Sequence, residues 1–472
     1  MTFTILHGKN LDILPTLPDN SVDSIVTDPP YELGFMGKKW DSSGIAYSVQ
    51  LWTECLRVLK PGGHLLSFGG TRTYHRVAVA IEDAGFQIRD NIAWLYGSGF
   101  PKSLDVSKAI DKGTGENEKR RLEFVAWMKT TGLNAKEINE IIGKADVGSH
   151  YLRLDQPAIA TADLFDKLRP YLPEVPEAIE RLVAERTGIE WTAYKNRAVL
   201  GSKPSSLGGT VAAGERNQEI IDFHKNKVVD ITAPSTPEAE QWEGWGTALK
   251  PAHEPIIVAR KPLEGTVAHN VLTHGTGALN IDGSRTGTSD NLNGGRYSDG
   301  KNENDSFVFG KGVNKRSKND FEQPKGRWPA NIILDEHTAG LLDEQSDASR
   351  FFYVAKASKR DRNEGLEDLP FIKGGSLSGG EDKRSQTTNQ PSRQNFHPTV
   401  KPTALMEYLV KLVTPPNGTV LDPFTGSGST GKAAILNGFD FIGIEMTEDY
   451  LPIIKARLKH AEATYGSQIR MD

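Results

Sequence analysis

Chemically useful groups stand together near the N-terminus in four consecutive residues, Asp28, Pro29, Pro30 and Tyr31. They follow Val22–Val26, a run rich in β-branched residues that predicts a short buried strand. The two prolines end this strand, because proline fixes φ and cannot donate to a ladder of hydrogen bonds. The turn then presents a carboxylate, proline carbonyls and an aromatic ring at the carboxyl edge of a strand, where open α/β sheets bind ligands.

This turn suits the activation of a weak amine nucleophile. The exocyclic amine of adenine or cytosine is such a group, because its lone pair is delocalised into the ring. An Asp carboxylate and a fixed backbone carbonyl can both accept hydrogen bonds from the amine, hold it in line with an electrophile and favour the developing positive charge. A neighbouring Tyr ring can stack on a base that has left its duplex. By itself, Asp-Pro-Pro-Tyr is equally compatible with an ordinary surface turn.

A glycine-rich turn near the C-terminus predicts a nucleotide-type ligand site. The turn Asp422–Thr430 lies between a predicted strand, Thr419–Leu421, and a predicted helix, Thr430–Leu436. Glycines permit tight turns and close backbone approach, and a helix N-terminus offers unpaired N–H groups. Glu445 lies 23 positions after Asp422, at the end of the next predicted strand. It can accept hydrogen bonds from ribose hydroxyls there.

The same turn also fits the start of a phosphate-binding P-loop. Gly426–Lys432 matches Gly-x4-Gly-Lys, but the next residue is Ala433, where magnesium binding in a P-loop needs serine or threonine. We therefore expect no hydrolysis of nucleoside triphosphates.

A third group of residues, His397-Pro398-Thr399-Val400-Lys401-Pro402, directly precedes a helix predicted over Ala404–Val413. Hydroxyl and ammonium donors at a helix start can hold a carboxylate. Taken alone, the segment is only a helix entry with two prolines.

The composition of the 472 residues, with 25% charged and 37% hydrophobic, indicates a globular protein of two or three domains. The formal net charge of −5 gives no overall basic signal, so any DNA-binding surface must come from local clusters. The single cysteine, Cys55, excludes an internal disulfide and a cysteine-based zinc site, and fits a reducing cytoplasm. No run approaches the roughly 20 apolar residues of a membrane span, and the N-terminus lacks a signal pattern.

Strands alternate with helices over the first hundred residues, which indicates a parallel α/β sheet. The predicted strands there are Thr2–Leu6, Val22–Thr27, His64–Phe68 and Gln87–Tyr96, and the predicted helices are Leu51–Leu59, which stops at the strong break Lys60–Gly63, and Tyr74–Ala84. Later segments predict the strands Pro255–Arg260, Asn331–Leu334 and Phe439–Ile444 and a closing helix, Glu448–Lys459.

From about Glu116 to Arg186 the chain predicts helices. Within them, Leu133–Gly143 followed by Val147–Tyr151 resembles a helix–turn–helix. The first short helix would bury Ile138, Ile141 and Ile142, and the second would expose to a DNA groove Ser149, His150 and Arg153. The alternative is a helical hairpin that only packs on the main domain.

Basic and aromatic residues are interleaved in polar segments further along. Lys301–Arg327 carries seven Lys or Arg against four Asp or Glu, together with Phe307, Phe309 and Phe321. A smaller basic cluster consists of Lys356, Lys359, Arg360 and Arg362. Such loops suit phosphate contact and base stacking, and they are equally compatible with a solvated surface. Gly374–Gln394 predicts a mobile linker.

Together, the three motifs resemble the DNA amino-methyltransferases, which methylate N6 of adenine or N4 of cytosine with S-adenosylmethionine. Asp28–Tyr31 is similar to the catalytic motif of that family, Asp422–Thr430 to its cofactor loop, and His397–Pro402 to its segment for the methionine end. The order of the motifs resembles the circularly permuted β class, and the whole pattern resembles solitary methylases of phages and prophages. The resemblance covers roughly residues 1–102, 249–285 and 396–472.

The resemblance implies an α/β fold with a mostly parallel, seven-stranded, Rossmann-like methyltransferase sheet and helices on both faces. It divides the chain into a catalytic half (1–102), a helical insert (103–200), a target recognition region with mobile loops (201–395) and a cofactor-binding half (396–472). The strand at 255–260 is a candidate for the core sheet.

The resemblance also implies roles for single residues. In the catalytic set Asp28, Pro29, Pro30 and Tyr31, the Asp28 carboxylate and the Pro29 carbonyl would hold the target amine and Tyr31 would stack on the flipped base. The implied cofactor set is Asp422, Phe424, Gly426, Gly428, Glu445, His397, Thr399 and Lys401, with Glu445 on the ribose and Thr399 and Lys401 on the cofactor carboxylate. One departure is Gly8-Lys9-Asn10 where the family usually has Gly-Asp, so Asn10 or Asp12 substitutes or that contact is missing.

The implied activity is site-specific, in-line transfer of a methyl group from S-adenosylmethionine to N6 of adenine in double-stranded DNA after base flipping, without a metal. We expect no membrane partner and a cytoplasmic location, and the sequence leaves open whether the chain forms a homodimer or accompanies a restriction enzyme. One alternative is N4-cytosine methylation on the same scaffold. Another is a DNA-binding regulator with an inactive catalytic half, which the absent acid beside Lys9 would suit. A methyltransferase acting on RNA or protein is a weaker alternative.

Overall fold

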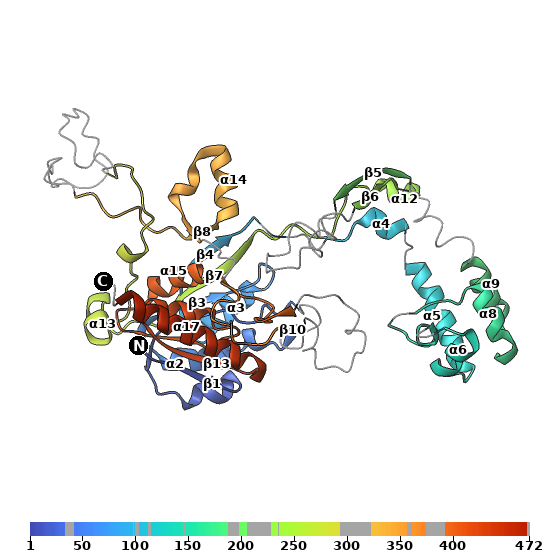
Figure 1. Ribbon diagram of the computed structural model, residues 1–472, viewed down its shortest axis with the longest axis horizontal. Coiled ribbons are helices and arrows are strands. Elements are labelled where there is room, and N and C mark those ends of the chain that lie inside the picture. The colour runs from blue at the N-terminus through green and yellow to red at the C-terminus, as the bar shows by residue number, and fades with distance from the viewer. Residues whose placement is uncertain are drawn as a thin grey trace. The chain divides into compact units, whose positions relative to one another are not determined.

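The computed structural model (Figure 1) describes residues 1–33, 42–97, 99, 103–111, 115–144, 147–155, 157–186, 198–204, 228–234, 236–292, 322–355, 361–373 and 392–469. The chain forms two compact units. The first contains Met1–Ser98 and Ala252–Asp472, and the second contains Gly99–Ala212 and Arg216–Pro251. All three motifs belong to the first unit. The division expected between residues 200 and 201 falls inside the second unit.

A large sheet forms the centre of the first unit, and in the described residues its order is β1-β13-β12-β2-β3-β7-β4-β8-β9. The strands are β1 (Phe3–His7), β2 (Val22–Thr27), β3 (Leu59–Phe68), β4 (Gln87–Leu95), β7 (His253–Arg260), β8 (Ile332–Asp335), β9 (Tyr353–Ala355), β12 (Thr419–Asp422) and β13 (Asp440–Glu445). Neighbouring strands are parallel except at β7, which is antiparallel to β3 and β4. The predicted mostly parallel α/β sheet is confirmed. Its described part has nine strands rather than seven, because β8 and β9 extend the edge beyond β4.

The helices of the first unit are α1 (Asn10–Ile13), α2 (Val49–Val58), α3 (Tyr74–Asp83), α13 (Val267–His274), α14 (Glu336–Ser346), α15 (Thr403–Val413), α16 (Ser429–Leu436) and α17 (Leu451–Ile469). Single 3-10 turns are η1 (Leu14–Thr16), η4 (Ile45–Tyr47), η7 (Asp282–Ser284), η9 (Ala348–Phe351) and η11 (Glu448–Tyr450). A short antiparallel pair joins β10 (Ile372–Lys373) and β11 (Ser392–Arg393).

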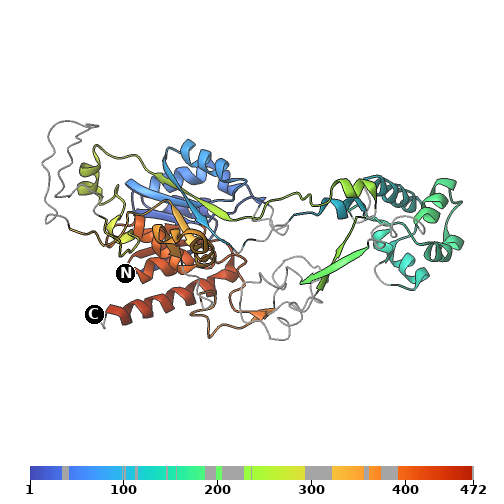
Figure 2. The same ribbon diagram turned by 90° about the horizontal axis from the view of Figure 1, so that it is seen from above.

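Both faces of the sheet are covered, because successive strand residues point to opposite sides. Val26 and Leu66 pack in one apolar core with side chains of α15, α16 and α17. Their neighbours Ile25 and Leu65 pack in another with side chains of α2 and α3. Figure 2 shows the red C-terminal helices and the blue N-terminal helices on opposite sides of the strands. The expected doubly wound arrangement is therefore present.

Strands from the two ends of the chain meet at the centre of this sheet. β12 pairs in parallel with β2, with Val420 opposite Ser24 and Leu421 opposite Ile25. Both strands therefore finish at the same edge, β2 just before Asp28 and β12 at Asp422. This pairing meets the first requirement of a site shared by the N-terminal and C-terminal motifs.

The predicted break at Lys60–Gly63, between a helix and the next strand, is wrong. The helix α2 ends at Val58, one residue before the predicted end at Leu59, and β3 begins at Leu59 and runs through the Pro-Gly-Gly segment. Gly62 adopts a φ of +75°, and a Cβ there would lie 2.4 Å from Nδ2 of Asn270. That amide donates a hydrogen bond of 2.9 Å to the Pro61 carbonyl. The strand continues because the segment after β7 supplies the partner that the proline-interrupted ladder lacks.

The second unit has its own apolar core. Its helices are α4 (Val106–Asp111), α5 (Gly115–Thr130), α6 (Ala135–Ile142), α7 (Val147–His150), α8 (Ala162–Leu168), α9 (Glu177–Arg186) and α12 (Pro237–Gln241), with the 3-10 turn η5 (Arg169–Tyr171) and a hairpin of β5 (Val199–Pro204) and β6 (Val228–Thr232). Phe124 of α5 and Phe165 of α8 are fully buried at its centre, with ring centroids 6.0 Å apart. The predicted helical character of this part is confirmed.

The helix–turn–helix expectation holds for its first half only. Ile138 and Ile142 of α6 are buried, whereas Ile141 is only half-buried against the same core. The Gly148 N–H of α7 donates to Oδ1 of Asn139 at 2.7 Å. A Cβ on Gly148 would lie 2.4 Å from the Ala135 carbonyl oxygen, so the two helices are in close contact.

The second half differs from the expectation. Ser149 and His150 are half-buried rather than exposed, while Arg153 is exposed and donates from Nε to Asp155 at 2.9 Å. With four residues, α7 has about one turn, which is too short to follow a DNA groove. The pair packs as a helical hairpin in the core of the second unit.

Several predicted loop features fall outside the described residues. These are Phe307, Phe309, Phe321, Lys356, Lys359, Arg360 and most of the segment Gly374–Gln394. Arg362 is described, and its guanidinium donates to the carbonyls of Asn395 and His397 at 3.2 and 2.9 Å. No helix in the described part of the chain is long and apolar enough to cross a membrane.

Candidate active site

Two hydrogen bonds from threonine hydroxyls fix the turn after β2. Thr27, the last residue of β2, donates from Oγ1 to Oδ1 of Asp422 at 2.7 Å. Thr73, at the start of α3, donates to the Tyr31 carbonyl at 2.8 Å. Pro29 is buried and Pro30 is half-buried, so the turn between the two anchors has little freedom. These contacts fix where the Asp28 carboxylate and the Tyr31 ring lie.

A lysine from the third motif lies against this turn. Lys401 donates from Nζ to Oδ2 of Asp28 and to Oε2 of Glu254, both at 3.0 Å. It also donates to the Tyr31 hydroxyl at 3.0 Å, and the Tyr31 hydroxyl donates to Oε2 of Glu254 at 2.7 Å. The ammonium further lies 4.7 Å from the centroid of the Phe68 ring. The expected contact of Lys401 is the cofactor carboxylate, which stays a prediction; in the structure the lysine contacts the Asp28–Tyr31 turn and Glu254.

The two oxygens of Asp28 have different surroundings. Oδ2 accepts from Lys401, whereas Oδ1 is buried and has no hydrogen-bond partner among the described residues. Burial raises the pKa of Asp28, the Lys401 ammonium opposes the rise, and the Glu254 carboxylate adds to it. A buried acceptor without a donor is costly, by about 1–3 kcal/mol. Oδ1 is therefore suited to accept a hydrogen bond from a bound molecule.

Charges in this cluster are set by the same contacts. Burial alone would lower the pKa of Lys401, but Asp28 and Glu254 hold it above its ordinary value, so the lysine stays charged. Burial and the two carboxylates raise the pKa of Tyr31 well above its usual range, so the hydroxyl keeps its proton. The two carboxylates and one ammonium leave an excess negative charge beside Oδ1. That charge favours a developing cation at the same place.

The glycine turn after β12 lies beside the catalytic turn. Asp422 is almost fully buried, and its Oδ1 also accepts the Phe424 N–H at 3.0 Å. Burial raises the pKa of Asp422 to about 6. Its side chain thus joins the ends of β2 and β12, a structural contact in addition to the cofactor role expected for it.

Glu445, at the end of β13, fixes the turn from the other side. Its Oε2 accepts the Gly426 N–H at 2.8 Å, and its Oε1 accepts the Thr447 N–H at 2.7 Å. Gly426 and Gly428 adopt φ values of +54° and +79°, which glycine adopts without strain. A Cβ on Gly426 would lie 2.9 Å from Nε2 of His397. The structure thus brings together four of the residues expected at the cofactor.

His397 is held in one orientation. Its Nδ1 contacts the Thr399 carbonyl, and its ring lies edge-on to the ring of Tyr450 at 4.7 Å. Burial lowers the pKa of His397 to about 4, so it is neutral at physiological pH. Thr399 is exposed in the same segment, and Phe424 is half-buried against the α2 and α3 core.

The segment Gly8-Lys9-Asn10, where the family usually has Gly-Asp, lies at the same edge of the sheet as Glu445. The Gly8 N–H donates to the Glu445 carbonyl at 3.0 Å, which continues the pairing of β1 with β13. Oδ1 of Asn10 accepts the Leu11 N–H at 3.0 Å, while Asp12 is exposed. Asn10 is the first residue of α1 and is nearer in sequence to this edge than Asp12.

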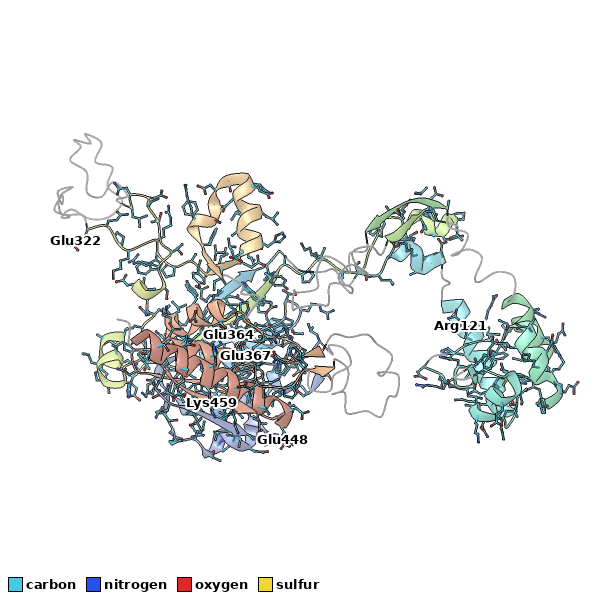
Figure 3. All side chains as sticks on the ribbon, viewed as in Figure 1. Arg121, Glu322, Glu364, Glu367, Glu448 and Lys459 are labelled. Carbon is cyan, nitrogen blue, oxygen red and sulfur yellow. The ribbon has the colours of Figure 1, made fainter. Side chains whose placement is uncertain are left out.

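The lysine of the P-loop-like sequence, Lys432, is paired with two carboxylates. Lys432 is 2% exposed, and its Nζ donates to Oδ1 of Asp361 at 3.2 Å and to Oε2 of Glu364 at 2.7 Å. Figure 3 labels Glu364 on the segment that lies against α17, where a Cβ on Gly365 would be 2.6 Å from Cβ of His460. A P-loop lysine must reach a phosphate, so this geometry supports the expectation that the turn is not a P-loop.

Three residues that take part in the site were missed in the sequence. Glu254 stands at the start of a β-branched strand, where a carboxylate is a signal worth testing. Arg457 is fully buried in α17 and donates from Nη1 to the Ser427 carbonyl at 2.6 Å, so it holds the glycine turn in place. Its position on an otherwise apolar helix face, beside Ile454 and Leu458, was the available signal. Asp361 lies within the basic cluster, between Arg360 and Arg362, and gave no such signal.

The arrangement can hold an amine at Asp28 and a second molecule at the glycine turn, on one edge of one sheet. In the described part of the chain, no three His, Cys, Asp or Glu side chains lie together as a metal site would require. An amine and a second molecule held at one edge in this way are placed for in-line transfer of a group between them.

Comparison with known proteins identifies relatives of this arrangement. The sequence profile of N6/N4 methyltransferases, described as DNA methylase, matches residues 22–158 and 212–456, which is most of the chain. The type II methyltransferase M2.LlaDCHI of Lactococcus lactis subsp. cremoris is 47% identical over 70 residues, 15% of this chain and 26% of that protein. The DNA adenine methyltransferase YhdJ of Escherichia coli (strain K12) is 45% identical over 62 residues, 13% of this chain and 21% of that protein. The matched segment spans about a quarter of the length of these relatives.

Two solved methyltransferase structures are similar to this chain at low sequence identity. The M1.HpyAVI–SAM complex is 15% identical, with a TM-score of 0.32, over 97% of this chain and 100% of that one. The cytosine-N4-specific PvuII DNA methyltransferase is 11% identical, with a TM-score of 0.37, over 99% of this chain and 92% of that one.

Proposed function

The chain belongs to the N6/N4 DNA methylase family, and from this premise we propose that it transfers a methyl group from S-adenosylmethionine to N6 of adenine in double-stranded DNA. The observation that carries the proposal is the unpartnered Oδ1 of Asp28 at the edge of the sheet that also carries the glycine turn. An acceptor there can take a hydrogen bond from the target amine and orient its nitrogen.

The residues of the glycine turn fit the cofactor. The Glu445 carboxylate is fixed by two backbone N–H groups and keeps lone pairs for ribose hydroxyls, because a carboxylate offers about four acceptor sites. Gly426 and Gly428 allow a ligand close to the backbone. When bound, S-adenosylmethionine supplies a methyl group on a positively charged sulfur. The residues that would hold it are Phe424, Gly426, Gly428, Glu445, His397 and Thr399, with Asp422 supporting the turn.

The mechanism assigns each catalytic group one task. The target base leaves the duplex at a cost of a few kcal/mol and stacks against Tyr31. Oδ1 of Asp28 and the Pro29 carbonyl accept the two amine hydrogens, with Pro30 keeping the turn rigid. With S-adenosylmethionine held at the glycine turn, these contacts would direct the nitrogen lone pair at its methyl carbon, and the thioether would be the leaving group. The excess negative charge around Asp28 would then favour the positively charged amine, and one amine proton would pass to Oδ1 of Asp28.

Target recognition is assigned to the residues outside the three motif segments, which include the helical insert at 103–200 and the region 201–395. One surface of the first unit supports this assignment. Trp328 is 65% exposed, and the Arg285 guanidinium lies 5.4 Å from its ring centroid. The Arg327 guanidinium lies 4.4 Å from the ring centroid of Phe351, which is 41% exposed. Aromatic rings beside guanidinium groups suit stacking on bases and contact with phosphates.

The direct test is the identity of the modified base. The protein is incubated with unmethylated duplex DNA and S-adenosylmethionine, and the DNA is digested and analysed by mass spectrometry. We expect N6-methyladenine, since the Asp-Pro-Pro-Tyr form of the motif is typical of adenine enzymes. N4-methylcytosine would establish the alternative on the same scaffold. An absence of both, together with no S-adenosylmethionine binding by calorimetry, would favour a DNA-binding regulator. Sedimentation of the DNA complex reports whether one chain or a homodimer is bound.

A further inference from the structure

A carboxylate outside all three motifs lies at the centre of the catalytic cluster. Glu254 is the second residue of β7, the antiparallel strand between β3 and β4. Its Oε2 accepts from the Tyr31 hydroxyl at 2.7 Å and from Nζ of Lys401 at 3.0 Å. Its side chain is 21% exposed, so both bonds are partly shielded from water. An antiparallel strand brings this residue to the edge because the start of β7 meets the ends of its parallel neighbours.

The donors and acceptors around Lys401 match in number. An ammonium has three N–H donors. Lys401 has three acceptors at 3.0 Å: Oδ2 of Asp28, Oε2 of Glu254 and the Tyr31 hydroxyl. All three donors are therefore used, and none remains for Oδ1 of Asp28, which is buried without a partner.

Removal of Glu254 would change this match. Lys401 would have one donor too many, and the carboxylate that it already binds offers an unsatisfied acceptor, Oδ1 of Asp28. The ammonium would then bind both oxygens and take the place of the target amine. The Tyr31 hydroxyl would lose its acceptor at the same time, so the ring would lose one of its anchors.

We propose that Glu254 is a positioning residue for methyl transfer: it anchors Lys401 and Tyr31 so that Lys401 binds only Oδ2 of Asp28 and leaves Oδ1 for the target amine. The assignment rests on the proposed function and deepens it at the same site. Glu254 touches neither the base nor the cofactor in this scheme and acts through Lys401 and Tyr31.

A pH profile distinguishes this role from a merely structural one. The charged and titratable groups that act on Asp28 are Lys401, Glu254, Tyr31 and Asp422, and those that act on its partners are Tyr96 and His397. The negative charge of Glu254 contributes to the raised pKa of Asp28, and the positive charge of Lys401 opposes it. Removing the first should lower the pKa of Asp28, and removing the second should raise it.

The experiment measures single-turnover methylation of duplex DNA against pH for the wild type, Glu254→Ala and Lys401→Met, because alanine removes both the charge and the acceptor of Glu254. For Glu254→Ala we expect at least a tenfold lower rate, a KM for S-adenosylmethionine within twofold of wild type, and an acid limb shifted to lower pH. For Lys401→Met we expect a lower rate with the acid limb shifted to higher pH. The matched control is Glu54→Ala, because Glu54 is 23% exposed and pairs with Arg57 at 2.9 Å on α2, away from the site. It should behave as wild type.

Each outcome decides the assignment. Opposite shifts of the two acid limbs with a retained cofactor KM support it. A wild-type rate for Glu254→Ala overturns it, and so does a lower rate with an unmoved acid limb, which would mean that Glu254 only supports the fold. If the wild type itself transfers no methyl group to DNA, the proposed function fails first, and this assignment falls with it.

Discussion

Replacing Gly426 by alanine tests the proposal that the glycine turn binds the cofactor. The added methyl group is the smallest side chain that the turn should not tolerate. Gly426 has a φ of +54°, where an L-residue is strained. The added Cβ would lie 2.9 Å from Nε2 of His397. His397 cannot easily retreat, because Nδ1 is bound to the Thr399 carbonyl and the ring lies against Tyr450. The turn must therefore shift, and the bond from the Gly426 N–H to Glu445 is the contact that it would lose.

The expected size follows from those two effects. The left-handed conformation costs alanine about 1 kcal/mol of stability. Loss of a hydrogen bond to a charged group costs about 1.5–3 kcal/mol. If the turn must recover that bond when the cofactor binds, the Kd for S-adenosylmethionine rises roughly tenfold to a hundredfold.

Isothermal titration calorimetry of the variant with S-adenosylmethionine measures this effect directly. Gly143→Ala is the matched control, because Gly143 has a φ of +73° and its Cβ would meet nothing within 4 Å. It should lose a similar amount of stability from strain and keep the wild-type Kd. A Gly426→Ala protein with the wild-type Kd would refute the assignment of this turn to the cofactor.

Two further substitutions test the supports of the site. Burial raises the pKa of Asp422 from 3.8 to about 6, so between these pH values the folded state binds a proton that the unfolded state does not. The free energy of unfolding should therefore fall by up to about 3 kcal/mol as pH rises through this window. Asp422→Asn should remove this part of the pH dependence, as measured by urea titrations at pH 4 to 7. An unchanged pH dependence in the variant would contradict the raised pKa of Asp422. Lys432→Met leaves the buried carboxylate of Asp361 without its cation and should destabilise the protein by about 3 kcal/mol in the same assay. Neither the wild type nor this variant should bind ATP, and measurable ATP binding by the wild type would restore the P-loop interpretation.

The strands around the site could be predicted because their sequences carry local signals. β2 has the predicted bounds, since its β-branched run ends at two prolines. β12 and β13 are similarly marked by the residues on either side of the glycine turn. The path of β3 through Pro61 could not be predicted, because its support comes from Asn270, more than two hundred positions away.

The contacts within the site could likewise be predicted only in part from the sequence. The pairing of β2 with β12 follows from motif order, so the proximity of Asp28 and the glycine turn was expected and is found. The partner of Lys401 was not, because a sequence does not say which of two nearby anions a flexible ammonium will reach. Glu254 was missed for a related reason: its strand is antiparallel, and the direction of a strand is a tertiary property.

The central claim is that Asp28 activates the target amine beside a separately built cofactor turn. Asp28→Ala tests it in one experiment, when S-adenosylmethionine binding by calorimetry and methyl transfer to duplex DNA are measured on the same preparation. Because Asp28 makes no described contact with the glycine turn, we expect a Kd within about threefold of wild type, less than 0.7 kcal/mol, and no detectable transfer. Transfer by the Asp28→Ala protein at a rate comparable to wild type would contradict the account.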